Sequence, residues 1–140
     1  MKPCVIDASM VVSAFFQEAG AEQARVLLVA GGGLHAPDLI YAEVANVIWK
    51  RSGRGEVDEQ EAGQLLADFL RLPLRITPSG ELVAPALQLA LRTGRTVYDC
   101  LYPAPAVKTK TVMVSADKRL VNALAGGPLG KHVAWIGDYR

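Results

Sequence analysis

Short apolar segments alternate with longer amphipathic ones along the chain. The short segments are rich in β-branched residues and predict buried strands at 4–7, 34–37, 74–77, 111–115 and 133–136. Between them, apolar residues recur at helical spacing, which predicts helices over 9–18, 20–33, 38–53, 57–72, 79–94 and 116–127. This alternation is typical of a parallel sheet with helices on both faces. The pattern therefore predicts one three-layer α/β/α domain over residues 1–140, with a central, mainly parallel sheet.

Several helix boundaries are indicated by individual residues. Ser9 is expected to cap the first helix, because its hydroxyl can accept a hydrogen bond from a free N–H of the first turn. The three glycines at 31–33 are expected to stop the second helix. They follow a helix rather than a strand, so they do not form a dinucleotide-binding fingerprint.

The composition is typical of a globular domain and gives no indication of a membrane span or a signal peptide. Apolar residues make up 51% of the chain, enough for a real core, and the net charge is +1. No apolar run approaches the length of a membrane span, and Asp7 stands where a signal peptide would need an apolar segment. The expected location is therefore the cytoplasm, without membrane contact. If four of the 14 acids meet at one site, the other ten face 15 Lys and Arg, which hints at a polyanionic partner.

Acidic residues follow two of the predicted strands. Asp7 ends the first strand segment, after the apolar residues Cys4, Val5 and Ile6, and Asp117 lies two residues beyond the fourth segment. Ligands of open parallel sheets bind beyond the carboxyl ends of the strands, so both carboxylates are expected at that edge. Each also has a simpler role, since Asp7 suits a turn and Asp117 could cap the helix beside it. Asp99 falls in the first turn of a helix, three residues after Thr96, which is also the spacing of a capping box.

Glu43 lies inside a predicted helix with apolar residues on both sides. At helical spacing it shares a face with Leu39, Asn46 and Val47. An unpaired buried carboxylate is expensive to desolvate, so an acid in this position needs a cation or strong donors. Pairing with Lys50 is the simpler alternative.

The available side chains favour a hard cation over zinc. Carboxylates gathered at one place repel one another, and a divalent cation reverses that balance. Mg²⁺ takes oxygen ligands, usually one or two carboxylates together with waters. Cys4 and Cys100 have no ligand spacing and are expected to be buried thiols. His35 and His132 lie far apart, and His35 is expected to be a packed strand residue.

Four segments follow one another in a recognisable order: VIDASMVVSAF, APDLIYAEVANVIWK, TVYDCLY and TVMVSADKRL. They resemble the motifs of PIN-domain ribonucleases, and the likeness is closest to VapC-type toxins of toxin–antitoxin pairs. Each motif is weak alone, but four in the right order on the right kind of element make a specific signal. The likeness covers nearly the whole chain.

The resemblance implies a PIN-like fold and endonuclease activity on RNA with Mg²⁺ or Mn²⁺. It also implies a homodimer and inhibition by a cognate, VapB-like antitoxin, for which the apolar helices near residues 10–16 and 39–49 could supply surfaces. Core burial is the simpler use of most of those residues. By the same resemblance, the catalytic, metal-binding acids fall on Asp7, Glu43, Asp99 and Asp117, and the supporting hydroxyls fall on Ser9 and Ser115.

Four basic residues flank two of these acids in sequence, namely Arg92, Arg95, Lys118 and Arg119. They could hold the RNA backbone, a salt-sensitive and sequence-blind contribution, or they could be ordinary solvated surface charges.

Other protein classes that place an acid after the first strand fit less well. A receiver domain needs an acid pair near that strand, and a haloacid-dehalogenase-like phosphatase needs a second acid where Ser9 stands. Neither scheme gives Glu43 a role. The serious alternative is a PIN fold that binds RNA or a partner protein and cleaves weakly or not at all.

Pro103 and Pro105 stand out in the segment DCLYPAPAV. PIN domains that the chain resembles normally have an unbroken apolar helix after the third acid. Each proline inside a helix costs roughly 3 kcal/mol and cannot donate to the carbonyl four residues earlier. We expect a kinked helix over this segment, with a short helix followed by an extended turn as the alternative.

Overall fold

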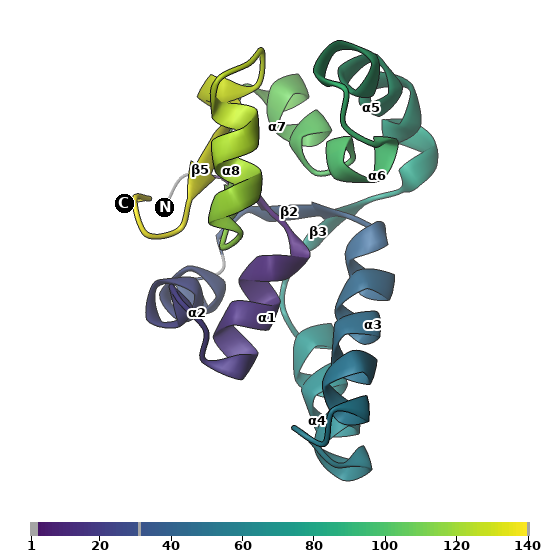
Figure 1. Cartoon of the computed structure of the whole chain (residues 1–140), viewed down its shortest axis with the longest axis vertical. Helices are drawn as coiled ribbons and strands as arrows, with labels where there is room; N and C mark the ends of the chain where they lie inside the picture. The colour runs from purple at the N-terminus through teal and green to yellow at the C-terminus, as the bar shows by residue number, and fades with distance from the viewer. Residues whose placement is uncertain (1–2, 31, 140) are drawn as a thin grey trace.

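The computed structural model describes residues 3–30 and 32–139, and these residues form a layered α/β domain (Figure 1). Within them, five short strands make one sheet in the order β3-β2-β1-β4-β5, and every neighbouring pair is parallel. The strands are β1 (Cys4–Ile6), β2 (Leu34–Pro37), β3 (Arg75–Thr77), β4 (Met113–Ser115) and β5 (Val133–Trp135).

Helices cover both faces of this sheet. The chain crosses from β1 to β2 through α1 (Ala8–Phe16) and α2 (Ala21–Ala30), and from β2 to β3 through α3 (Leu39–Gly53) and α4 (Glu59–Leu70). It returns to β4 through α5 (Ser79–Thr93), α6 (Val97–Cys100) and α7 (Pro103–Thr109), and reaches β5 through α8 (Lys118–Ala125) and a 3₁₀ turn, η1 (Gly130–His132). Helices α1–α4 lie on one side of the sheet and α5–α8 on the other, as Figure 1 shows, which is the arrangement that right-handed crossovers produce with this strand order. The predicted three-layer α/β fold with a parallel sheet is confirmed.

The central strands β1 and β4 are buried because helices pack on both of their faces. All residues of β1 and β4 are buried, including Ile6 and Val114. Cys4 and Cys100 are free thiols in this core, as the sequence predicts. No helix in the described part of the chain is both long and apolar enough to cross a bilayer.

The sheet has a topological switch point between β1 and β4. From β1 the chain moves to β2 on one side, whereas β4, the other neighbour of β1, leads to β5 in the opposite direction. The crevice beyond the carboxyl ends of these two strands is the usual ligand site of an open α/β sheet. Asp7 follows β1, and Ser115 ends β4, so the fold places both at this crevice.

The start of α1 differs from the prediction that Ser9 caps it. The helix begins one residue after the strand, and Asp7 is its N-cap, with its side chain accepting from the Met10 N–H. Asp7 keeps extended dihedrals while Ala8 is already helical, so Ser9 lies inside the first turn. The second helix, α2, ends at Ala30. The first of the three glycines expected to stop it, Gly31, lies outside the described residues.

The proline-containing segment forms two helices rather than one kinked helix. Between α6 and α7, Leu101 and Tyr102 keep helical dihedrals, so the extended-turn alternative is wrong as well. Pro103 is the first residue of α7, and Pro105 is the third. The first N–H groups of a helix have no intrahelical partner, so both prolines avoid the cost of an interior position. The helical segment is therefore interrupted, but the cost expected for prolines in a helix interior does not apply to these positions.

Candidate active site

Four acids from four separate segments line one pocket, which we call the acidic pocket. Asp7 follows β1, Glu43 lies on α3, Asp99 lies on α6, and Asp117 caps α8. The cavity measures about 180 Å³, and its lining residues are Asp7, Ala8, Ser9, Glu43, Tyr98, Asp99, Tyr102, Asp117 and Leu120. The fold thus brings together all four acids that the sequence singled out, at the switch point of the sheet.

Asp7 is the buried carboxylate of this pocket, with only 6% of its surface exposed. Both of its oxygens accept a hydroxyl hydrogen bond, from Ser9 to Oδ1 and from Ser115 to Oδ2, each at 2.6 Å. The Ser9 hydroxyl also accepts from the Ala116 N–H at 2.9 Å, and the Ser115 hydroxyl accepts from the Asp117 N–H at 3.0 Å. These two serines therefore join the ends of β1 and β4 and fix the orientation of the Asp7 carboxylate.

Burial raises the pKa of Asp7 to about 6, because the charged form loses hydration. The hydroxyls of Ser115 and Ser9 oppose this rise by donating to the carboxylate, and the nearby negative charge of Asp117 adds to it. The folded protein therefore holds this carboxylate ionised at neutral pH against an energetic penalty. A cation in the pocket would remove that penalty.

Glu43 is half-buried, and it has a strong donor as its partner rather than Lys50, the simpler alternative. The hydroxyl of Tyr102 donates to Oε1 of Glu43 across 2.5 Å. Among the described residues Glu43 forms no ion pair, with Lys50 or with any other side chain. Burial and the Glu43 carboxylate together raise the pKa of Tyr102 well above its ordinary value, so the hydroxyl stays protonated and remains a donor.

Tyr102 lines the acidic pocket, yet the sequence reasoning did not single it out. A signal was present, because Tyr102 stands three residues after Asp99 and helical spacing puts the two on one face. Pro103 and Pro105, which follow Tyr102, affect the backbone and give no information about this side chain.

Asp99 and Asp117 also have protein partners. Asp99 accepts from Arg95, whose Nε and Nη2 lie 3.3 and 3.2 Å from Oδ2. Asp117 accepts from the Leu120 N–H at 3.1 Å and so caps α8, which was the simpler of its two expected roles. Its place in the acidic pocket means that the cap and a role at the site do not exclude one another.

The donor chemistry of the acidic pocket fits a hard divalent cation. Its lining offers oxygen ligands, among them four carboxylates, and contains no His or Cys, and a cation would relieve the buried Asp7 of its desolvation penalty. The carboxylates are not yet gathered around one point, because no three His, Cys, Asp or Glu side chains in the described ranges form a ready ligand group. Any such cation must therefore draw the carboxylates together or use fewer of them along with water.

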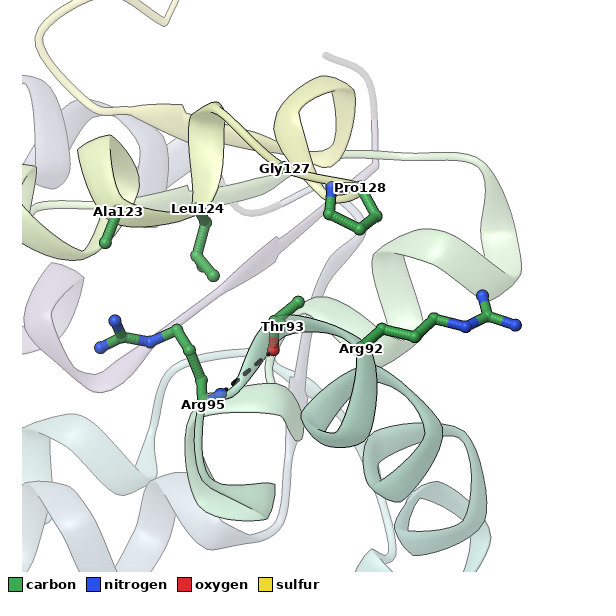
Figure 2. Close-up of a pocket in the computed structure, with 7 residues that line it drawn as sticks. All are labelled: Arg92, Thr93, Arg95, Ala123, Leu124, Gly127 and Pro128. Carbon is green, nitrogen blue, oxygen red and sulfur yellow. Dashed lines mark hydrogen bonds between the residues drawn. The ribbon is translucent and has the colours of Figure 1, made fainter.

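Two adjoining hollows next to the acidic pocket, on the side of α5 and α8, are lined by Arg92, Arg95 and Arg119, and we call them the basic groove. One hollow shares Asp99 and Asp117 with the pocket and adds Arg95 and Arg119 to its lining. The next hollow continues from Arg95 to Arg92. Figure 2 shows this second hollow between the end of α5 and the end of α8, with the Arg92 and Arg95 side chains directed to opposite sides.

The four flanking basic residues predicted from the sequence divide into two kinds. Arg95 is paired with Asp99, and the ammonium of Lys118 lies 4.5 Å from the ring centroid of Trp135. Arg92 and Arg119 are exposed, and neither forms an ion pair within residues 3–30 and 32–139. These two arginines are therefore the ones available to a polyanion.

The fold and the pocket together define a class: an α/β domain with carboxylates at the switch point between β1 and β4. A family model described as "PIN domain" matches residues 4–125. The chain belongs to the PIN domain family.

Two similar proteins are both named as ribonucleases of the VapC type. Ribonuclease VapC3 of Pyrobaculum aerophilum is 35% identical over 118 residues, which cover 83% of this chain and 90% of that protein. Ribonuclease VapC12 of Mycobacterium tuberculosis is 32% identical over 120 residues, which cover 85% of this chain and 90% of that protein.

Solved structures with the same fold agree with this assignment. The crystal structure of PAE2754 from Pyrobaculum aerophilum superposes with a TM-score of 0.70 and 21% identity, covering 96% of this chain and 84% of that one. A toxin–antitoxin complex from Klebsiella pneumoniae gives a TM-score of 0.60 and 16% identity, covering 94% of this chain and 95% of that one.

Proposed function

We propose that this protein is an endoribonuclease and the toxin of a toxin–antitoxin pair, hydrolysing RNA phosphodiesters at the acidic pocket with Mg²⁺ or Mn²⁺. The meeting of four carboxylates from four segments at the switch point carries the proposal. The names of the relatives, ribonucleases of the VapC type, support the choice of RNA as substrate.

In this proposal the acids and the serines of the acidic pocket have different roles. Asp7, Glu43, Asp99 and Asp117 would hold the cation, and a bound cation would supply a water of lowered pKa and a positive charge to offset the charge on the phosphate. Ser9 and Ser115 keep the Asp7 carboxylate aimed into the pocket through their 2.6 Å hydrogen bonds.

Cleavage of RNA by the purified chain tests this function, with and without a chelator. Asp99→Asn should abolish cleavage and leave the fold intact, because Asp99 is partly exposed and its ion pair with Arg95 is local. Asp68→Asn is the matched control, since Asp68 also makes a local pair, with Arg71 on α4, away from the pocket. Full activity of Asp99→Asn, or activity that persists in chelator, would contradict the assignment.

The same assay decides the alternative function, a PIN domain that binds RNA or protein without cleaving it. One observation favours that alternative: each of the four carboxylates already accepts a hydrogen bond from the protein. A non-catalytic chain would bind RNA in the basic groove and leave it intact whether or not divalent cation is present.

The basic groove would hold the RNA backbone on one side of the scissile phosphate. Each phosphate contact contributes ~0.7 to the slope of log affinity against log salt for a single strand. Replacing both Arg92 and Arg119 by glutamine in an Asp99→Asn background should therefore lower the slope by ~1.4. Arg71→Gln on α4 is the control and should leave the slope unchanged.

An antitoxin partner, a homodimer and a cytoplasmic location complete the proposal. The toxin–antitoxin complex with the same fold supports the antitoxin. The dimer is supported by Val83, Leu87 and Leu91, which are 45%, 50% and 78% exposed along one face of α5. A molar mass by light scattering equal to that of one chain over a wide concentration range would contradict the dimer.

A further inference from the structure

We propose that Tyr102 is a positioning residue of the acidic pocket, whose hydroxyl holds the Glu43 carboxylate in place for the divalent cation. This inference rests on the proposed function and deepens it.

The hydrogen bond between Tyr102 and Glu43 joins the two helical layers across the end of the sheet. Glu43 lies on α3, on one side of the sheet, and Tyr102 lies between α6 and α7, on the other. The two residues are 59 positions apart in sequence, and their oxygens are 2.5 Å apart. Tyr102 is only 6% exposed, so its ring is fixed by the core while its hydroxyl reaches the pocket.

Tyr102 stands at the interruption between α6 and α7. Pro103 has no N–H to give to the carbonyl of Asp99, so α6 cannot continue as a regular helix. The helix α7 instead begins at Pro103, and Tyr102 is the residue that immediately precedes it, at the corner between the two helices. Leu101 and Tyr102 keep helical dihedrals, so Tyr102 stays on the same face as Asp99, three residues earlier, and both line the acidic pocket.

Glu43 needs such a partner because its side chain is long and only half-buried. A free glutamate loses considerable rotamer freedom when it is fixed at a ligand. The Tyr102 hydroxyl binds Oε1, and Oε2 makes no hydrogen bond within the described residues, so it is left for a cation. Partners that orient a metal ligand in this way typically contribute 10- to 100-fold in metal affinity, as an order of magnitude.

Calorimetry of Mn²⁺ binding to the purified, RNA-free chain tests the inference. Tyr102→Phe keeps the buried ring and removes only the hydroxyl, and it should weaken Mn²⁺ binding by roughly 10-fold. RNA cleavage by this variant should recover when the cation concentration is raised. Tyr41→Phe is the matched control, because Tyr41 lies on α3 close to Glu43 and packs on Phe69. It should bind Mn²⁺ like the wild type.

A purely structural role for Tyr102 would lower stability and leave the affinity for Mn²⁺ unchanged, and that result overturns the inference. Affinity that rises in Tyr102→Phe also overturns it, since the hydroxyl would then compete with the cation for Glu43. If Tyr102 acts through Glu43, Tyr102→Phe should add no further loss of affinity in a Glu43→Gln background. Wild-type protein that binds no cation and cleaves no RNA overturns the proposed function together with this inference, whereas unchanged affinity in Tyr102→Phe overturns the inference alone.

Discussion

Replacing Asp7 by asparagine should make the metal-free protein more stable at neutral pH. Asp7 is almost completely buried, and its pKa is raised from 3.8 to about 6 in the folded chain. A carboxyl group with a raised pKa stabilises the fold while it is protonated. Its contribution is complete below the unfolded pKa and is lost as the pH rises through the folded pKa.

The size of this effect follows from the two pKa values. The interval from 3.8 to about 6, at about 1.4 kcal/mol per pH unit, corresponds to a loss of about 3 kcal/mol between acid and neutral pH. Asparagine cannot ionise, so the variant does not suffer this loss. Asparagine is also as good an N-cap as aspartate, so α1 keeps its start.

Urea unfolding of both proteins in chelator, at about pH 4 and about pH 7.5, measures the effect. The stability of Asp7→Asn relative to the wild type should rise by about 2 kcal/mol between the two pH values, because part of the loss has already occurred at about pH 4 and the other titrating groups cancel in the difference. A relative stability that stays flat or falls over this range would refute the reasoning. The same variant should be inactive, so the pocket would gain stability as it loses function.

Three further changes test other parts of the account by urea unfolding. Pro103→Ala should alter the free energy of unfolding by less than ~1 kcal/mol, because Pro103 is the first residue of α7. A gain in stability near ~3 kcal/mol would mean that the proline strains a continuous helix. Ser115→Ala should cost ~1–3 kcal/mol and more at neutral than at acid pH, because the hydroxyl donates to the ionised form of Asp7, and an equal cost at both pH values would contradict this. Phe69→Ala should cost ~3–5 kcal/mol, because Phe69 lies on the buried face of α4 and is 1% exposed, and a cost below ~1 kcal/mol would place it outside the core.

The fold could be predicted from the sequence because its signals are local and repeated. Strands β1 and β4 are short buried segments, and each is followed by an acid at the carboxyl edge of the sheet. The rule that ligands bind at this edge was therefore enough to expect Asp7 and Asp117 together. The structure brings Glu43 and Asp99 to the same pocket, as the family resemblance implied.

The contacts that fine-tune the pocket could not be predicted, because they depend on which side chains meet across the sheet. The partner of Glu43 is Tyr102, 59 residues away, and no periodicity relates the two. The cap of α1 was assigned to Ser9 because serine is a common N-cap, but the helix begins directly after the strand and takes Asp7. Pro103 was expected to weaken a helix, and only the backbone shows that a new helix begins there.

Mapping the new RNA ends that the purified chain generates in total RNA tests the central claim most directly. With Mg²⁺, the wild type should produce discrete new ends that are absent in chelator and absent with Asp99→Asn, while Asp68→Asn produces the same ends as the wild type. Ends that persist in chelator or with Asp99→Asn, or no new ends at all in Mg²⁺ or Mn²⁺, would contradict cleavage at the acidic pocket.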